Sequence, residues 1–187
     1  NLRWKSGEAM KKQVIPQTRP ATELEIEKLQ RQAYDLAKKG DYKSALALCD
    51  WLVEDASTRV AGLRQRSAVR EHQGEMERAI EDLEAVISAG VDEPADMHAL
   101  GMLYLQGERD YEADQVLARG IEICARENAH YYLNSCRLLR AEALLRVGRK
   151  DIALAELRAL PPEYSAYVYG SGLRTREAMM EEAERRG

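Results

Sequence analysis

The amino-acid sequence predicts an all-α fold in which helix–turn–helix units stack into a solenoid. The five prolines are at positions 16, 20, 94, 161 and 162. Residues 21–93 and 95–160 therefore contain none, which permits long helical tracts interrupted only by tight turns. Within these tracts Ala45, Ala79 and Ala113 recur at intervals of 34 residues. A fixed period of this length is typical of stacked helix pairs, which need a small residue where the helices approach closely.

The first unit shows the pattern that the later units repeat. Apolar residues recur at helical spacing in residues 29–37 and again in residues 45–52. The turn Lys39-Gly40-Asp41-Tyr42 lies between them. We expect Gly40 to adopt the left-handed conformation that ends a helix, and Asp41 to begin the next one.

The later units keep this order of elements, with one longer step. The turn glycine returns as Gly74 and Gly148, and Ala153 continues the alanine series after a step of 40 residues. We expect the six extra residues, 128–133, to lengthen the first helix of the fourth unit. The chain then passes Pro161-Pro162 and ends in a charged segment, where we expect a last helix to cover the apolar end of the array.

These residues resemble the tetratricopeptide repeat (TPR) family over about three quarters of the chain. The family pattern has Leu-Gly and Tyr in helix A, a Gly-Asp-Tyr turn and Ala in helix B. Leu100-Gly101 with Tyr104 matches the first part, and Gly40-Asp41-Tyr42 with Ala45 matches the second. Arg70 departs from the pattern, because it stands where the family usually has Tyr. The resemblance implies a right-handed α-solenoid of about four TPR-like helix-turn-helix repeats with a C-terminal capping helix. The repeats fall at about 26–59, 60–93, 94–127 and 134–167, and the capping helix at about 173–186.

Composition and charge exclude several functions. Of the 187 residues, 45% are hydrophobic and 32% are charged, as in a packed protein with a charged surface. No apolar run approaches the ~18 residues of a membrane-spanning helix, so we expect no membrane partner. The net charge is −4, and general binding to phosphates needs a basic surface, so we expect no nucleic-acid partner. Arg64, Arg66 and Arg70 form a local basic run, which we expect the surrounding Glu residues to neutralise.

Residues 1–20 differ from the rest of the chain. They carry five Lys and Arg against one Glu, a net charge of +4, which leaves −8 for residues 21–187. We expect a basic N-terminal arm over residues 1–20 and a single TPR-like domain over residues 21–187. The arm lacks the apolar core of a signal peptide, and the three cysteines form no CxxC pair. These features favour reduced, buried thiols and a cytoplasmic location, with a leader already removed as the alternative.

The sequence contains no signature of catalysis. It has no GxSxG, no Walker-type phosphate loop, no GxGxxG and no HExxH. Cys124, His130 and Cys136 are each six residues apart, a spacing that does not keep three ligands on one helical face. We therefore expect no catalytic residues, no cofactor and no metal, and we do not predict an enzyme.

The resemblance places the ligand of a TPR protein against helices A, which line a concave groove. Carried over position by position, it implies ten groove residues. They are Arg31, Tyr34, Lys38, Arg64, Gln65, His72, His98, Met102, Gln106 and Arg146. Over all helix A positions, those of the first two repeats are polar with several cations and those of the last two are more apolar, which suits a segment with acidic and apolar residues. Met102, Leu138 and Leu139 either line the groove or are buried against the capping helix.

The function expected from these features is that of a protein–protein interaction module that binds a protein or peptide segment in the groove. A bacterial adaptor or secretion chaperone is the first candidate class. The alternative is an immunity-type inhibitor that neutralises a cognate toxin, which would present a concentrated acidic surface to a basic target. A structural subunit that self-associates through its solenoid ends is a third class.

Overall fold

The computed structural model describes residues 14–185. Of the expected arm, residues 1–13 lie outside this range. Residues 14–21 form no helix or strand. The chain divides into two compact units, unit 1 (Asn1–Val69) and unit 2 (Arg70–Gly187), which are described separately. The expected single domain over residues 21–187 stays a prediction.

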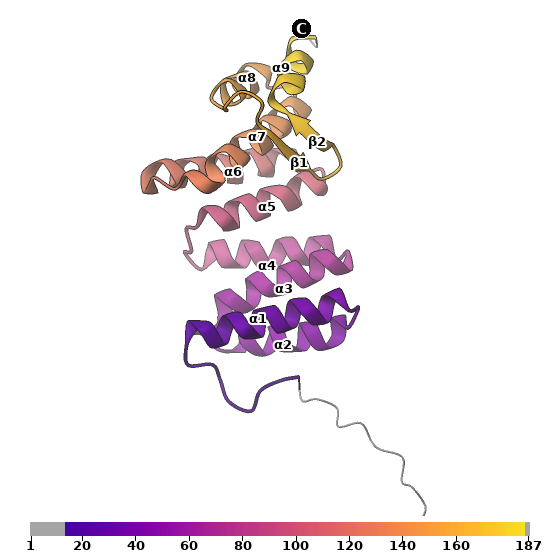
Figure 1. Cartoon of the computed structure of the whole chain (residues 1–187), viewed down its shortest axis with the longest axis vertical. Coiled ribbons are helices and arrows are strands. Elements are labelled where there is room, and N and C mark those ends of the chain that lie inside the picture. Colours follow the sequence, from indigo (N-terminus) through magenta and orange to yellow (C-terminus); the bar gives the residue numbers. More distant parts are fainter. Residues whose placement is uncertain (1–13, 186–187) are drawn as a thin grey trace, which may run out of the picture. The chain divides into compact units, whose positions relative to one another are not determined.

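Unit 1 holds the first helix pair, α1 (Glu23–Lys38) and α2 (Tyr42–Glu54), and most of α3 (Arg59–Gln73) (Figure 1). Thr22 begins α1 with a capping box: its side chain accepts a hydrogen bond from the Glu25 amide, and the Glu25 carboxylate accepts one from the Thr22 amide. The Asp41 side chain begins α2 by accepting from the Ser44 amide, as the sequence predicts. The core of this unit packs α1 against α2, with Val69 of α3 added.

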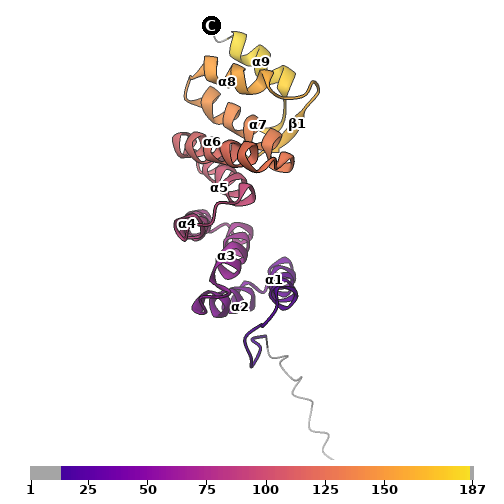
Figure 2. The same ribbon diagram turned by 90° about the vertical axis from the view of Figure 1, so that its left-hand side faces the viewer.

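Unit 2 contains the remaining elements. They are α4 (Met76–Ser88), α5 (Pro94–Gln106), α6 (Asp110–Glu127), α7 (His130–Arg146), α8 (Lys150–Arg158), β1 (Ser165–Val168), β2 (Gly172–Thr175) and α9 (Arg176–Arg185). The two strands pair antiparallel. The hairpin lies beside α7, and α9 lies beside α8 (Figures 1 and 2). A continuous apolar core runs from α4 to α9.

The repeat prediction is confirmed by the helix pairs and by their contacts. Ala45, Ala79, Ala113 and Ala153 lie in the second helix of successive pairs, and each is fully buried. Leu100-Gly101 of the family pattern is also a contact between helices. A Cβ at Gly101 would lie 2.5 Å from a methyl group of the buried Leu117 side chain, so α5 and α6 approach closely there.

The fourth pair differs from the prediction in its boundary. Residues 130–133 do lengthen the first helix of this pair, because α7 begins at His130. The other two extra residues form the turn before it: α6 continues to Glu127, and Asn128 ends it in the left-handed conformation.

The C-terminal region differs more. We predicted a capping helix at about 173–186, but α9 begins only at Arg176, and residues 172–175 form β2. The physical reason is local. Ala166-Tyr167-Val168 includes two residues of high β-propensity, and positive φ values are taken by Gly170 in the turn (80°) and by Gly172 at the start of β2 (77°). The fold is all-α with one added β-hairpin.

The close packing at Ala79 predicts that a larger side chain there destabilises the protein. Ala79→Leu should lower the free energy of unfolding by about 1–3 kcal/mol, because Ala79 is fully buried and a larger side chain must displace its neighbours. Ala85, exposed on the same helix, provides the control. Ala85→Leu should change stability little in the same urea titration, and equal effects of the two changes would contradict the packing assignment.

The turn between α5 and α6 predicts a stabilising change. Gly40, Gly74 and Gly148 end their helices with φ of 80°, 85° and 78°, and Glu108 occupies the corresponding place with φ 57°. A residue with a Cβ is strained in this conformation, so Glu108→Gly should raise the free energy of unfolding by about 0.5–1 kcal/mol. Gly74→Ala should have the opposite sign. Chemical denaturation checks both, and a destabilised Glu108→Gly variant would refute the strain argument.

Candidate functional site

The ten residues expected to line the groove are divided between the two units. Unit 1 holds Arg31, Tyr34, Lys38, Arg64 and Gln65, and unit 2 holds His72, His98, Met102, Gln106 and Arg146. A single concave groove formed by all ten stays a prediction. Each set is described within its own unit.

In unit 1 the expected residues form a polar, cationic surface on α1 and α3. Tyr34 is 47% exposed, and the Lys38 ammonium lies 5.4 Å from the centroid of its ring, close enough for a cation–π contact. Arg31, one turn before Tyr34, is exposed as well. The Gln30 side chain donates a hydrogen bond to the Ala61 carbonyl oxygen (3.1 Å), which holds α3 beside α1. The half-exposed Arg64 and Gln65 follow one turn after Ala61.

Two arginines of the basic run at 64–70, Arg66 and Arg70, form ion pairs with aspartates. Arg66 forms an ion pair with Asp50 (2.8 Å) in unit 1. In unit 2, Arg70 pairs with the buried Asp82 (2.8 Å) and also donates to the Arg78 carbonyl oxygen. Asp50 lies on α2 and Asp82 lies on α4. The first ion pair therefore joins α3 to α2 within unit 1, and the second joins the end of α3 to α4 within unit 2.

In unit 2 the expected residue His98 belongs to an internal chain of contacts. Its Nε2 lies 2.6 Å from the Ser135 hydroxyl, and its ring centroid lies 5.3 Å from that of Tyr132. Burial lowers the pKa of His98, which favours the neutral imidazole. The Tyr164 hydroxyl, whose pKa burial raises, also forms a hydrogen bond with Ser135. This chain of contacts joins α5, α7 and the residue before β1.

Arg146 is also held inside the unit. Its guanidinium donates to the Leu105 carbonyl oxygen (2.9 Å), Asp110 (3.2 Å), Glu142 (3.1 Å) and the Ser171 hydroxyl (2.9 Å). Burial raises the pKa of Asp110, and its pairing with Arg146 opposes that shift. With these four partners Arg146 ties α5, α6 and the turn of the β-hairpin to α7.

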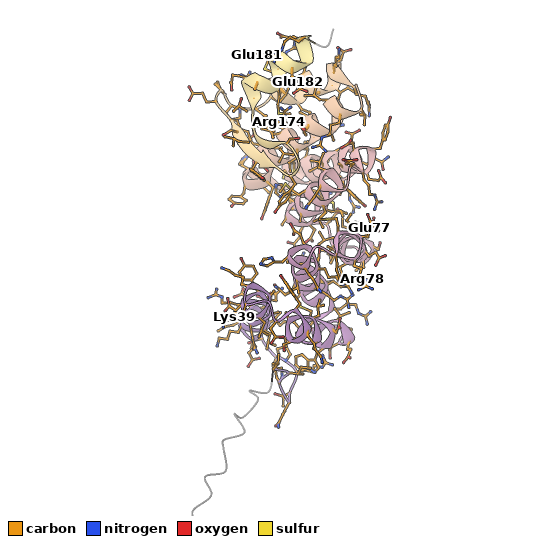
Figure 3. The ribbon with its side chains drawn as sticks, turned by 90° about the vertical axis from the view of Figure 1, so that its right-hand side faces the viewer. Lys39, Glu77, Arg78, Arg174, Glu181 and Glu182 are labelled. Carbon is orange, nitrogen blue, oxygen red and sulfur yellow. The ribbon has the colours of Figure 1, made fainter. Side chains whose placement is uncertain are left out.

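Glu142 is the buried carboxylate at the centre of this network. It accepts hydrogen bonds from Arg146, from the Ser171 hydroxyl (2.6 Å) and from Arg174 of β2 (2.8 Å). Arg174 also pairs with Glu182 of α9 (2.6 Å), and Figure 3 labels both residues. The network therefore fixes the hairpin against α7 and α9.

The remaining positions of helices A in unit 2 include both buried and exposed side chains. Leu138 and Leu139 are fully buried in the core that also contains Met179 and Ala183 of α9. Met102 packs against this core and is partly buried. His72 and Gln106 are exposed.

The hairpin adds exposed side chains that the sequence analysis missed. Tyr167 and Leu173 lie directly opposite each other in the register and are 61% and 69% exposed. The ring of Tyr169 meets that of Tyr167 edge to face, with centroids 5.9 Å apart. The run Tyr167-Val168-Tyr169 followed by Gly-Ser-Gly was the signal that could have predicted the hairpin.

Two hollows accompany these surfaces. One of about 550 Å³ opens on α1 in unit 1. The other, of about 420 Å³, lies in unit 2 between α4, α5 and α6, and its floor includes Leu100 and Tyr104. The Tyr104 hydroxyl donates to Glu84 (2.6 Å), and the Arg109 guanidinium lies 4.6 Å from the centroid of its ring. The polar groups that line the second hollow are thus partly engaged within the protein.

In residues 14–185, no group of three His, Cys, Asp or Glu side chains is arranged to hold a metal ion. Cys49, Cys124 and Cys136 are buried, and burial raises the pKa of Cys136 to about 12, so its thiol stays protonated. None of the helices in this range combines the length and the apolar character needed to cross a bilayer.

The sequence matches no protein-family model and no curated protein. Solved structures, in contrast, share its fold. YrrB, a TPR protein with an unusual peptide-binding site, is 22% identical to this chain, and the two structures superpose with a TM-score of 0.58. The match covers 70% of this chain and 64% of the YrrB chain, so this chain spans less than two thirds of the length of YrrB. The TPR-like repeats of a kinesin light chain homologue from Podosopora anserina give 19% identity and a TM-score of 0.61, over 86% and 84% of the two chains.

A third similar structure is MamA (residues 41 to the end) from Desulfovibrio magneticus RS-1. It is 18% identical with a TM-score of 0.57, over 72% of each chain. Likeness at such low identity is a likeness of fold. With the 34-residue period, the left-handed turn glycines and the buried alanines, these matches lead to one conclusion: the chain has the tetratricopeptide repeat fold.

Proposed function

We propose that this chain is a non-catalytic protein–protein interaction module that binds a segment of another protein along its helices A. The observation that carries this proposal is the surface of unit 1 around Tyr34. A tyrosine that is 47% exposed, with Lys38 against its ring and Arg31 one turn away, contributes little to the core. Tyr and Arg are the residue types found most often as binding hot spots. The peptide-binding site of YrrB, a protein of the same fold, adds support.

The chemistry of this surface indicates the ligand. Arg31, Lys38 and Arg64 are cationic, so a segment with carboxylates suits it, and the Tyr34 ring offers apolar contact area. A bacterial adaptor or secretion chaperone, which holds an extended segment of its client, is the class that we propose. An extended segment suits helices A because it can contact several of them in succession.

An immunity-type inhibitor is the second candidate, and the charge of unit 2 favours it. Residues 70–187 carry 15 Lys and Arg against 23 Asp and Glu, a net charge of −8. A basic toxin would be attracted to such a unit. However, much of the acid-rich stretch on α4 is neutralised within the protein, because Glu75 pairs with Arg78, and Arg109 lies 3.7 Å from both Glu77 and Glu84.

The proposal predicts that groove residues matter for binding and not for folding. Tyr34→Ala and Arg64→Ala should each weaken partner binding by about 1–2 kcal/mol, because each removes a large contact anchor. Helical circular dichroism and the melting temperature should change little. The partner is first isolated by affinity capture with the wild-type chain, and the variants are then compared by titration calorimetry.

Arg78→Ala is the matched control. Arg78 is exposed on α4 (Figure 3), and its guanidinium forms an ion pair with Glu75 (3.1 Å). This change should leave binding unaltered. A partner that loses affinity with Arg78→Ala and binds the Tyr34 and Arg64 variants normally would refute the assignment to helices A and favour the inhibitor.

A further inference from the structure

Helix α1 has a second solvent-exposed face, next to the one that carries Tyr34. A hollow of about 550 Å³ opens on it. It is lined by Val14, Lys28, Arg31, Gln32, Asp35, Leu36 and Lys39. Residues 28, 32, 35 and 39 recur at helical spacing and share one side of α1, and Arg31 lies between this side and the side of Tyr34. The hollow is therefore a separate surface from the expected groove.

The hollow has an apolar floor and a cationic rim. Val14 and Leu36 are partly buried and pack against the core of unit 1, so they form the floor. The Gln32 side chain donates to the Val14 carbonyl oxygen (3.3 Å), which holds the segment before α1 in place as one wall. The rim carries three cations, Lys28, Arg31 and Lys39, against the single carboxylate of Asp35. Figure 3 labels Lys39 at the surface of the unit.

These three cations form no close ion pair within the described chain. Neither Lys28 nor Arg31 nor Lys39 forms an ion pair with another residue in the range 14–185. Other basic residues of unit 1 do, since Arg19 pairs with Glu54 and Arg66 with Asp50.

The carboxylate of Glu25, one turn before Lys28, is already engaged. It accepts hydrogen bonds from the amides of Ala21 (2.7 Å) and Thr22 (3.1 Å). These hydrogen bonds hold its pKa below the usual value, and the positive charge of Lys28 contributes to the same shift. The residues that line the hollow itself carry three positive charges against one negative charge, above an apolar floor.

We infer that this hollow docks an acidic segment of a partner protein, in which carboxylates flank an apolar side chain. The carboxylates would meet Lys28, Arg31 and Lys39, and the apolar side chain would cover Leu36 and Val14. The inference rests on the proposed protein-binding function and names a site and a partner chemistry for it. A smaller hollow of about 250 Å³, also in unit 1, shares Lys28 and Gln32 with this hollow, so an extended segment has room for several residues.

A protein segment fits this surface better than a nucleic acid does. No aromatic side chain lines either hollow, so bases have no ring on which to stack. Asp35 within the rim repels a continuous row of phosphates, but it can accept a hydrogen bond from a peptide amide. The apolar floor also requires a ligand that alternates charge with hydrocarbon.

The test uses the full chain and a fluorescein-labelled dodecapeptide, Glu-Glu-Leu repeated four times, in anisotropy titrations at low salt. Lys28→Glu with Lys39→Glu should weaken binding of this peptide at least about tenfold, because two attractive contacts become repulsive. The matched control is Lys43→Glu with Arg158→Glu, which changes the net charge equally at exposed positions outside both hollows. The control should change affinity less than about twofold, since distant charges are screened. Circular dichroism checks that both variants fold.

Two further probes complete the test. A Glu-Glu-Ser dodecapeptide should bind more weakly than the Glu-Glu-Leu peptide, and a twelve-residue oligothymidylate should not compete. Equal loss in the control variant, no preference for Leu, or competition by the oligonucleotide would each overturn the inference. Tyr34→Ala with Arg64→Ala separates the two proposals. If that pair abolishes peptide binding and the lysine pair does not, the groove function stands and the hollow is not the site.

Discussion

Close approach of neighbouring helices is the constraint on which the rest of the structure depends. Ala45, Ala79, Ala113 and Ala153 are fully buried, one in each second helix, and Gly101 leaves space for Leu117 where α5 meets α6. A larger side chain at these places would separate the helices and open cavities between layers. The small residues of the repeat therefore set how closely these helices approach.

The second constraint is the buried carboxylate of Glu142. Taking a carboxylate out of water is costly unless charged partners surround it, and Arg146, Arg174 and the Ser171 hydroxyl do so here. Removing one partner from such a buried pair typically costs about 3–5 kcal/mol, since an uncompensated charge remains. The hairpin is thus held by polar contacts on α7 and by the fully buried Val168. The same contacts engage Arg146, which the repeat pattern alone would place in a ligand groove.

These two constraints explain how far the sequence could predict the molecule. The repeat, its turns and its buried alanines follow from short-range spacing, so they could be predicted from periodicity. The role of Arg146 could not, because its partners Leu105, Asp110 and Ser171 come from three other elements. The hairpin could have been predicted from the local β-propensity of residues 166–168. It comes after a strongly helical pattern, however, and that pattern favours a further helix. Leu138 and Leu139 lie in the same core as Met179 of α9, and the start of that helix was predicted three residues too early.

The distribution of ion pairs separates structural charges from charges available to a ligand. In unit 2 the arginines that face other helices are paired: Arg140 binds both Asp114 (2.7 Å) and Glu156 (2.6 Å), and Arg149 binds Asp114 (2.9 Å). Such pairs align α6, α7 and α8, and a ligand that competed for them would disturb the packing. In unit 1, Lys28, Arg31 and Lys39 form no ion pair with another residue in the range 14–185. A partner can meet them without breaking an ion pair, so the free energy of the new ion pairs contributes to binding instead of replacing existing stability.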